Sequence, residues 1–370
     1  MQLSYWEIKN WFTNVDFTIV GSGIVGLHAA LALRERFPSA KILVLEKGVL
    51  PQGASTKNAG FACFGSISEI IHDLKFHSEE EVIQLIQKRY LGLQLLRKNL
   101  GDAALDLKPF GGYELFLKED EPFYNECLQK IPFINEFLKP LFKAEVFLKQ
   151  MDRFQFGGIF EYLIFNPFEA QIDTGNMMQS LLKKAHQNDI LILNNQTVTH
   201  HQELNDGVEA VTNGITFKTN KLIFTTNGFA SQLTHNQVQP ARAQVLITKP
   251  IPNLDIKGTF HLDQGYYYFR NINDRILLGG GRNLDFEGET TTSHETTELI
   301  QSHLEELLKN VILPQTHFEI DHRWSGTMGI GAYKKPIVEQ LSNHVYCGVR
   351  MGGMGVAIGS IIGQELADLI

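Results

Sequence analysis

Phe17-Thr-Ile-Val-Gly-Ser-Gly-Ile-Val-Gly-Leu-His28 is the stretch that decides the fold. An apolar, β-branched run stops at Gly21, glycines recur at Gly23 and Gly26, and a helical pattern follows. The next apolar run ends at Glu46, twenty residues after Gly26. A strand, a glycine turn, a helix, a strand and an acid in this order are the arrangement of a dinucleotide site. The segment therefore predicts that an ADP-containing cofactor binds near the N-terminus.

Each glycine of this motif has a physical task. Gly21 permits the tight turn out of the strand, Gly23 lets the backbone approach a pyrophosphate, and Gly26 lets the helix pack close to the sheet. The N-terminus of the helix favours phosphate, and Glu46 is placed to accept hydrogen bonds from a ribose. The alternative is a glycine turn that merely packs, with Glu46 a solvated strand end. The predicted contacts of this segment are Gly21, Gly23, Ile24, Val25, Gly26, Glu46 and Lys47.

The composition is that of a folded protein. The chain has 370 residues, of which 43% are hydrophobic and 20% charged, and a formal net charge of -8. This length accommodates two domains, and the negative charge argues against a general nucleic-acid binder. Cys63, Cys127 and Cys347 lie far apart in the sequence, which fits a reducing compartment without a disulfide framework.

Neither a targeting segment nor a membrane span is indicated. Residues 1–11 have no basic segment followed by an apolar core, so we expect no signal peptide. No apolar run approaches the roughly 20 residues that a membrane-spanning helix needs. No spacing of metal ligands is visible, and His200 and His201 would point to opposite faces of a strand. We therefore expect a cytoplasmic protein with no membrane, nucleic-acid or metal partner.

Strand-like and helix-like segments alternate at both ends of the chain and again in the middle. Ser78 is the expected cap of one helix, with Glu81 three residues on. Residues 50–66 are interpreted as a loop, and 109–170 as strands alternating with short helices. Further β-structure is expected over 207–228 and 245–281. The other expected strands are 16–20, 41–45, 190–193 and 345–347, and the expected helices are 24–37, 78–100, 174–186, 293–310 and 356–370.

This alternation predicts a cofactor domain assembled from several segments and interrupted by β-rich, aromatic ones. We expect the cofactor domain to comprise residues 1–100, 172–238 and 316–370. The substrate domain would then comprise residues 101–171 and 239–315. The predicted class is α/β, with a Rossmann-like cofactor domain and an inserted α+β substrate domain built on a mostly antiparallel sheet.

Three further segments favour a flavin over a nicotinamide cofactor. Gly53-Ala-Ser-Thr-Lys-Asn-Ala-Gly-Phe61 is a loop of small residues that can run under an extended cofactor. Leu222-Ile-Phe-Thr-Thr-Asn-Gly228 is an apolar strand whose end suits a passing dinucleotide. Gly348-Val-Arg-Met-Gly-Gly-Met-Gly355 leads into the last helix, whose N-terminus would stabilise the negative charge that reduction places on a flavin. A nicotinamide enzyme needs no such second glycine-rich helix start.

With these segments, the chain resembles the D-amino-acid oxidase-type flavoprotein superfamily, which includes glycine, sarcosine and γ-glutamylputrescine oxidases. The resemblance covers nearly the whole chain and also includes Gln171-Ile-Asp-Thr174, Asp263-Gln-Gly-Tyr-Tyr-Tyr-Phe-Arg270, Leu278-Gly-Gly-Gly281 and Arg323-Trp-Ser-Gly-Thr-Met-Gly329. It implies bound FAD and oxidation of a carbon–nitrogen bond of a small amine or amino acid. The implied steps are hydride transfer to flavin N5, hydrolysis of the imine, and reoxidation by oxygen or another acceptor. The further FAD contacts that it implies are Ala54, Ser55, Thr56, Asn58, Ala59, Gly60, Phe61, Val198, Thr226, Asn227, Gly228, Gly326, Met351, Gly352, Gly353, Met354, Gly355 and Val356.

The chain departs from the family's pattern at two charged positions. Amino-acid-oxidising members commonly hold the substrate carboxylate with an arginine at the place of Met328, and a bidentate guanidinium suits a carboxylate. The run around Met328 instead resembles the γ-glutamylputrescine oxidase branch, whose substrate presents an amine. Some relatives carry a lysine near the flavin that helps oxygen to react, and Leu277 stands at its place. Lys57 is the nearest substitute, with a phosphate or solvent contact as the alternative, so oxidase and dehydrogenase both stay open.

Three arginines are candidate ligands for a substrate carboxylate. Arg350 opens the last glycine cluster and is expected nearest to the flavin. Arg270 and Arg282 are the other two, and for them ordinary surface or interdomain positions are the alternative.

Aromatic residues are expected to wall the pocket. Tyr266 and Tyr268 share one face of a strand, with Tyr267 on the other, and Trp324 is the third candidate. An aromatic core stripe is the alternative. The expected catalytic or substrate-contacting residues are Lys57, Tyr266, Tyr268, Trp324, Met328 and Arg350.

The resemblance further implies that FAD is bound non-covalently. Asn58 stands where relatives attach FAD through a histidine, and no cysteine stands near the Trp-Ser-Gly segment. Cys63 and Cys347 lie in cofactor-proximal segments, where we expect them to be small buried residues. The alternatives to an FAD enzyme are a nicotinamide-dependent dehydrogenase and a non-enzymatic flavoprotein with a binding or assembly role.

Overall fold

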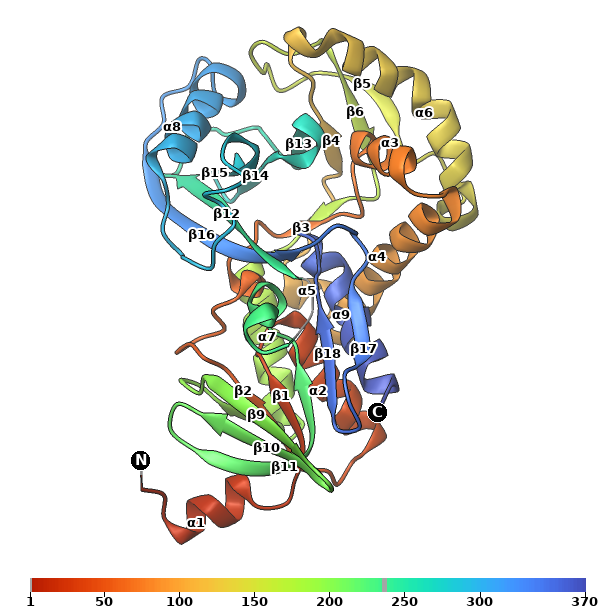
Figure 1. Cartoon of the computed structure of the whole chain (residues 1–370). Coiled ribbons are helices and arrows are strands. Elements are labelled where there is room, and N and C mark those ends of the chain that lie inside the picture. Colours follow the sequence, from red (N-terminus) through yellow and green to blue (C-terminus); the bar gives the residue numbers. More distant parts are fainter. Residues whose placement is uncertain (1, 235–237) are drawn as a thin grey trace.

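The computed structural model describes residues 2–234 and 238–370. Met1 and residues 235–237, which fall inside the expected cofactor domain, lie outside the described residues. Figure 1 shows two bodies, one above the other, each built around a sheet. This arrangement confirms the predicted α/β class.

The first sheet is built around the strand that precedes the glycine turn. Its neighbours on both sides run parallel to it, and one antiparallel strand ends the ladder. The four strands predicted for this body are present within two residues of their expected ends. In spatial order the strands are β17 (Ile337–Gln340), β18 (Val345–Val349), β11 (Thr216–Phe224), β1 (Val15–Val20), β2 (Ile42–Leu45) and β8 (Leu191–Leu193), with β10 (Gly207–Thr212) and β9 (Val198–Leu204) as an antiparallel extension of β11.

Three of the helices beside this sheet pack closely through glycines. A Cβ atom built on Gly359 would lie 2.8 Å from Ile24 Cγ2, and one built on Gly363 would lie 2.7 Å from the Ala29 nitrogen. A Cβ on Gly92 would overlap the Ala357 carbonyl oxygen. Glycine is therefore required where these helices touch. The helices of this body are α2 (Ile24–Arg36), α4 (Glu79–Leu100), α7 (Thr174–Gln187) and α9 (Gly355–Asp368), with short α1 (Tyr5–Glu7) and α5 (Asp102–Leu105).

The expected helix start at Ser78 is confirmed. The Ser78 hydroxyl accepts from the Glu81 nitrogen (3.3 Å), and the Glu81 carboxylate accepts from the Ser78 nitrogen (3.0 Å). This capping box satisfies two of the backbone donors that a helix N-terminus leaves free.

The second sheet is mostly antiparallel, as predicted. The one parallel contact along its order joins β4 to β13. Its aromatic core includes Phe260 and Phe269, whose rings stack at 4.5 Å between centroids. In spatial order the strands are β16 (Ile320–Ile330), β12 (Gln239–Thr248), β15 (Arg275–Gly280), β14 (Tyr267–Ile272), β13 (Thr259–Leu262), β4 (Gly112–Glu114), β6 (Tyr162–Asn166) and β5 (Leu148–Met151). β3 (Phe61–Ala62) and β7 (Ala170–Gln171) form a separate two-stranded sheet.

The prediction of short helices within residues 109–170 is wrong. One long helix, α6 (Glu121–Phe142), occupies much of this segment although it contains Pro132 and Pro140. An interior proline costs about 3 kcal/mol, but α6 buries one face, including Ile134 and Leu138, in a cluster with α3 (Ile67–Phe76). The stabilisation from this burial outweighs the tendency of the two prolines to interrupt a helix. The sequence pattern alone does not reveal how large that stabilisation is.

The helix expected over 293–310 begins later than expected. α8 spans Glu298–Leu307 and continues into a wider π-turn over Leu308–Ile312. The hydroxyls of Thr291 and Ser293 accept hydrogen bonds from backbone nitrogens two residues on. These local bonds compete with helix formation.

The boundary between the two bodies differs from expectation at one strand. β16 lies within the segment 316–370 assigned to the cofactor domain, yet it pairs along its length with β12 of the second sheet. We propose that the chain returns to the cofactor domain after β16 rather than at residue 316.

Replacing Gly26 with alanine tests the close approach at the start of α2. A Cβ there would overlap the Gly21 carbonyl oxygen and lie 2.6 Å from Thr225 Oγ1. Gly26→Ala should therefore destabilise the fold by about 1–3 kcal/mol, as overpacking does, and should lower the amount of flavin that co-purifies. Thermal unfolding and flavin absorbance measure both. Gly214→Ala is the matched control, because open space surrounds Gly214; equal losses in both variants would contradict the role of Gly26.

Candidate functional site

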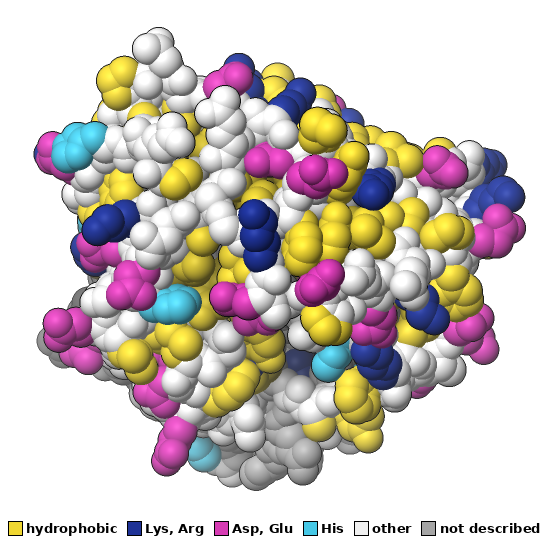
Figure 2. Space-filling view, turned by 90° about the horizontal axis from the view of Figure 1, so that it is seen from above, with side chains coloured by type: hydrophobic (Ala, Val, Ile, Leu, Met, Phe, Trp, Pro, Cys, Tyr) yellow, Lys and Arg dark blue, Asp and Glu magenta, His cyan; other side chains and the backbone are white. Residues whose placement is uncertain are grey.

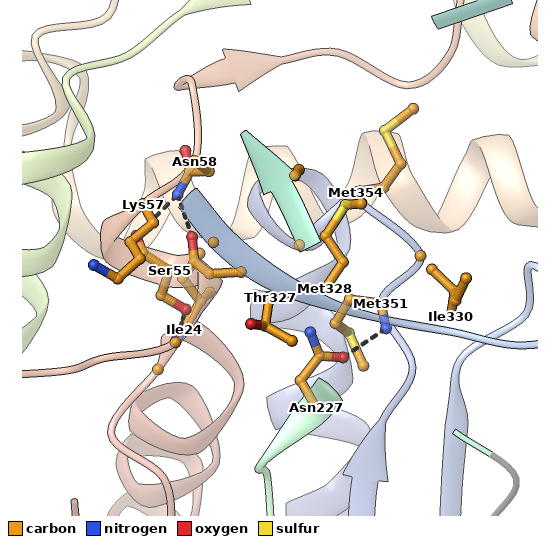
Figure 3. Close-up of a pocket in the computed structure, with 18 of the residues that line it drawn as sticks. Ile24, Ser55, Lys57, Asn58, Asn227, Thr327, Met328, Ile330, Met351 and Met354 are labelled. Atoms are coloured by element: carbon orange, nitrogen blue, oxygen red, sulfur yellow. Dashed lines mark hydrogen bonds between the residues drawn. The ribbon is translucent and has the colours of Figure 1, made fainter. Parts of the chain in front are cut away.

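A cavity of about 800 Å³ lies where the carboxyl ends of the first sheet's parallel strands face the second sheet. Ligands of open α/β sheets bind at this edge. Figure 3 shows that residues from distant segments, such as Ile24, Asn58, Asn227, Met328 and Met354, converge on it. The cavity therefore draws on both bodies of the fold.

The glycine turn after β1 forms one end of the cavity. Gly21 has φ 107, a conformation open to glycine. A Cβ on Gly23 would lie 2.8 Å from the Ser55 hydroxyl, which in turn accepts from the Ile24 nitrogen at 3.0 Å. The turn and the 53–61 loop are thus joined directly at the N-terminus of α2.

Glu46 lines the cavity but already has partners. Its Oε2 accepts from the nitrogen (3.2 Å) and hydroxyl (2.8 Å) of Ser22, and its Oε1 from the nitrogens of Gly48 (3.0 Å) and Gln52 (3.4 Å). A carboxylate has about four acceptor positions, so the protein uses them to shape the loops around the glycine turn. The expected bond to a ribose stays a prediction.

Asn58 organises the 53–61 loop. Its Nδ2 donates to the carbonyls of Ala54 (3.1 Å) and of Ser55 (2.9 Å; Figure 3), and its Oδ1 accepts from the Gly60 nitrogen (2.8 Å) and the Thr174 hydroxyl (3.0 Å). The side chain thereby fixes the loop over the cavity.

Two distant glycine-rich segments meet through Asn227. Its Oδ1 accepts from the Met351 nitrogen at 3.1 Å (Figure 3), which joins the end of β11 to the loop before α9. Gly352 and Gly353 have φ 58 and 81 in that loop, and both line the cavity. The N-terminus of α9 follows directly at Gly355, as the sequence predicts.

Five predicted site residues do not line the cavity. Gly26 and Gly228 are taken up by packing, since a Cβ on Gly228 would lie 2.9 Å from Thr327 Cγ2. The Thr56 hydroxyl donates to the Pro51 carbonyl (2.6 Å) instead, and Arg350 Nε donates to the Lys335 carbonyl (2.9 Å). Trp324 is the fifth and is treated below. The predicted residues that do line the cavity are Gly21, Gly23, Ile24, Val25, Glu46, Lys47, Ala54, Ser55, Lys57, Asn58, Ala59, Gly60, Phe61, Val198, Thr226, Asn227, Tyr266, Tyr268, Gly326, Met328, Met351, Gly352, Gly353, Met354, Gly355 and Val356.

Trp324 supports the cavity wall rather than forming it. Its indole Nε1 donates to the Lys57 carbonyl at 2.9 Å. A Cβ on Gly326, two residues further along β16, would lie 2.9 Å from Lys57 Cβ. Trp324 therefore positions the loop that carries Lys57.

The aromatic wall follows the predicted alternation. Tyr266 and Tyr268 line the cavity, whereas Tyr267 is buried in the core of the second sheet. Phe61 meets the Tyr268 ring edge-on at 5.7 Å between centroids. Burial raises the pKa of Tyr268 to about 12, so its phenol stays neutral and available as a hydrogen-bond donor.

A cluster at the cavity contains two residues to which no motif pointed, His261 and Glu169, beside Cys63 from a segment predicted to lie near the cofactor. His261 and Cys63 line the cavity, and Glu169 lies behind them, so that the ligand atoms of the three fall within 4.8 Å of one another. His261 Nε2 lies 3.0 Å from Glu169 Oε2. The residues come from segments far apart in sequence, and no local spacing could have revealed them.

The arginines named as candidate carboxylate ligands are held elsewhere or lie at the rim. Arg270 is buried, and its Nη1 donates to the carbonyls of Gly60 (3.0 Å) and Ile172 (2.7 Å). Arg282 lines the cavity with its guanidinium 4.7 Å from the Phe286 ring. Leu277, at the place of the relatives' lysine, is buried beside Ala59.

The cavity fits FAD on the evidence of its own unsatisfied groups. The hydroxyls of Thr226 and Thr327 are buried without a hydrogen-bond partner among the described residues, and both side chains line the cavity. Buried polar groups are normally bonded. A polar, extended cofactor running from Gly21 to Met351 would supply partners to both.

Comparison with known proteins matches the chain to one family model over nearly its whole length. The model described as FAD dependent oxidoreductase matches residues 16–369. The probable oxidoreductase OrdL of Haemophilus influenzae is 21% identical over 378 residues, covering 96% of this chain and 83% of the relative.

Solved structures share the fold. Glycine oxidase from Geobacillus kaustophilus has a TM-score of 0.76 at 17% identity, over 96% of this chain and 94% of its own. L-Proline dehydrogenase from P. horikoshii has a TM-score of 0.75 at 16% identity, over 96% and 93%. Iminodiacetate oxidase from Chelativorans sp. has a TM-score of 0.75 at 17% identity, over 95% and 94%.

Trp324→Phe tests whether the indole bond holds the 53–61 loop. The variant keeps an aromatic ring but removes the donor to the Lys57 carbonyl, so we expect a loss of about 1 kcal/mol in stability and weaker retention of flavin. Unfolding curves and dialysis of the yellow protein measure these. Trp11→Phe, at a side chain 37% exposed, is the control; if both variants retain flavin equally, the indole bond does not hold the loop.

Proposed function

The chain belongs to the family of FAD dependent oxidoreductases, and from that premise we propose that it oxidises a carbon–nitrogen bond of a small amine or amino acid. The observation that carries this proposal is the cavity, in which a glycine-lined cofactor cradle faces the aromatic wall of Tyr266 and Tyr268. Family membership sets aside the nicotinamide and non-enzymatic alternatives. The solved relatives carry glycine, proline and iminodiacetate in their names, which supports a substrate of this chemical class.

The residues that would hold FAD lie along the whole cavity. Gly21, Gly23 and the N-terminus of α2 at Ile24 favour the pyrophosphate, and Met351 to Val356 with the N-terminus of α9 favour negative charge at the other end. Bound FAD would accept the hydride that leaves the carbon next to nitrogen, so that the substrate becomes an imine, which water hydrolyses.

The protein's own part is to position the substrate and to exclude water. Phe61, Tyr266 and Tyr268 line the space in front of the residues that would hold the cofactor. These aromatic side chains exclude water, which strengthens electrostatic interactions with a substrate bound there. Positioning a substrate in this way supplies much of the rate in the absence of a protein nucleophile. Lys57, from the loop on the opposite side, is the proposed contact for oxygen or another acceptor.

We further propose that FAD is held without a covalent bond. Asn58, at the place of the relatives' histidine, uses its side chain within the loop. Cys63 is buried, and burial raises the pKa of its thiol well above the usual range, which keeps it unreactive. Acid precipitation of the protein should release all the flavin into solution.

Location and partners follow the same proposal. All three cysteines are buried, and Cys63 and Cys127 are free thiols, which supports the expectation of a cytoplasmic protein. Among the described residues, no helix combines the length and apolarity needed to cross a bilayer. Figure 2 shows acidic and basic side chains interspersed over the face seen from above, so neither sign forms one field there for nucleic acid.

An anaerobic reduction screen tests the proposed function. The purified protein should show the absorbance of an oxidised flavin, and a small amine or amino acid should bleach it without oxygen. Amines, D-amino acids and L-amino acids form the panel. The screen detects substrates whatever the electron acceptor. If dithionite bleaches the flavin but no member of the panel does, oxidation of a carbon–nitrogen bond is the wrong function.

Met328→Arg tests the place of Met328 in the substrate cavity. A guanidinium there adds a charge-assisted bond to a carboxylate, which contributes about 1.5–3 kcal/mol, and 1.4 kcal/mol is a factor of ten. We expect kcat/KM for amino acids to rise about tenfold relative to the matching amines that lack the carboxylate. Met151→Arg, at a side chain 60% exposed, is the control. An unchanged preference in Met328→Arg would remove Met328 from the substrate contacts.

A further inference from the structure

His261 presents one ring nitrogen to the cavity and holds the other on Glu169. The side chain belongs to β13, is 5% exposed and lines the cavity. Nε2 is bound to Glu169 Oε2 at 3.0 Å. Nδ1 has no hydrogen-bond partner within residues 2–234 and 238–370, so it is the nitrogen left to meet a ligand.

Glu169 is built into the fold as the anchor of this histidine. Its Oε2 also accepts from the Thr259 hydroxyl (2.9 Å), and its Oε1 from Asn166 Nδ2 (3.4 Å). Gly112 leaves room for it, because a Cβ there would overlap the carboxylate. A buried carboxylate with these partners fixes the ring orientation of His261, as a positioning residue does.

The charges around His261 keep its imidazole protonated at neutral pH. Burial alone would lower the pKa of His261, but the Glu169 carboxylate, with smaller contributions from Glu69 and Glu114, raises it to about 9. Burial raises the pKa of Glu114 itself to about 7, and the Cys63 thiol is neutral. His261 therefore offers an N–H donor that carries positive charge, the stronger kind of donor toward an anion.

A bound metal ion explains the cluster less well. Cys63, Glu169 and His261 lie close enough to share one ion, but a thiol must lose its proton to bind a metal. Burial and the nearby carboxylates Glu169 and Glu69 oppose that loss. The hydrogen bond between His261 Nε2 and Glu169 Oε2 forms without an ion.

Other basic groups near the cavity are engaged by the protein. Lys334 is paired with Asp73 at 2.5 Å, and Lys47 lies 3.3 Å from the centre of the Phe229 ring. Arg350 and Arg270 are bonded to backbone carbonyls. Lys57, on the loop wall, and Arg282, which lines the cavity beside Phe286, are the remaining competitors for an anion. His261 lies on the sheet wall beside Phe61, with 5.3 Å between ring centroids.

We propose that His261 binds the carboxylate of an amino-acid substrate, donating from Nδ1 while Glu169 holds Nε2. The proposal rests on the proposed oxidation of a carbon–nitrogen bond and narrows its substrate to one that carries a carboxylate. Amino-acid-oxidising relatives commonly bind the substrate carboxylate with an arginine at the place of Met328. In this chain the proposal gives that role to His261 on β13.

Binding of benzoate to the flavin-loaded protein tests this without turnover. Benzoate carries a carboxylate and no oxidisable amine, and its entry should perturb the flavin spectrum. Benzamide, of the same shape but uncharged, is the matched probe. We expect His261→Gln to weaken benzoate about tenfold or more and benzamide less than about twofold. His186→Gln, an exposed histidine on α7, should change neither.

The pH dependence separates a charged anchor from a merely structural residue. In the unaltered protein, benzoate affinity should be full at neutral pH and fall as the pH rises through about 9, where the folded His261 loses its proton, while benzamide affinity stays level. Glu169→Gln keeps a hydrogen-bonding partner for His261 but removes the negative charge that keeps the imidazole protonated. The loss of benzoate affinity should therefore occur at lower pH in this variant. Lys57→Met should leave the midpoint of that fall in place.

Each outcome bears on the proposal. Benzoate binding that is independent of pH in the unaltered protein overturns it, even if His261→Gln fails to fold. Equal weakening of benzoate and benzamide in His261→Gln assigns the residue to cavity shape and also overturns it. If the loss of benzoate affinity at high pH disappears in Lys57→Met but persists in His261→Gln, Lys57 and not His261 binds the carboxylate. Failure of the reduction screen with an intact benzoate response would instead reject the proposed function and leave the anion site standing.

Discussion

The approach of backbone to backbone at the start of α2 is the constraint on which the rest of the structure depends. The Gly26 backbone packs against the Gly21 carbonyl and the Thr225 side chain, and α9 packs on the same helix through Gly359 and Gly363. Side chains at these positions would push the helix off the end of β1. The free N–H groups of α2 could then not face the cavity, and α9, which closes its other end, would lose its support. The glycines bury no side chains, but they leave the backbone N–H groups accessible. An anionic cofactor binds to such backbone donors.

A second constraint joins the substrate sheet to the cofactor cradle. The Arg270 guanidinium lies on β14 and donates to the carbonyls of Gly60 and Ile172, at the point where the 53–61 loop meets the start of α7. Burial lowers the pKa of Arg270 to about 10, a cost that the two bonds to carbonyls offset. Trp324 makes a similar bond to the Lys57 carbonyl from β16. Both residues looked like substrate ligands in the sequence. In the structure they hold the loop between the two bodies, and the substrate wall is left to Tyr266, Tyr268 and His261.

Features produced by residues close together in sequence were predicted correctly, whereas several features that depend on distant residues were not. β1, α2 and β2, the capping box at Ser78 and the glycine-rich segments were predictable because neighbours in sequence produce them. The long helix α6 was not, because burial against α3 overrides its two prolines. Side-chain direction was the weakest inference. Arg350 stands one residue from the cavity-lining Met351, yet its positive φ of 68 turns it toward the Lys335 carbonyl. Thr56 and Gly228 are neighbours of lining residues, but the Thr56 hydroxyl donates to the Pro51 carbonyl and Gly228 packs against Met328 and Thr327.

The sequence by itself determined the cofactor end of this protein, because a backbone that must approach a phosphate excludes side chains and leaves glycines at set spacings. It also determined the family, since several such segments occur in order along one chain. Only the tertiary structure decided the substrate end. His261 and Glu169 lie on different segments, and their pairing depends on the register of β13 beside β4 and on the space that Gly112 leaves. The charge of His261 likewise depends on burial beside a carboxylate, a property of three-dimensional packing that no spacing along the chain expresses.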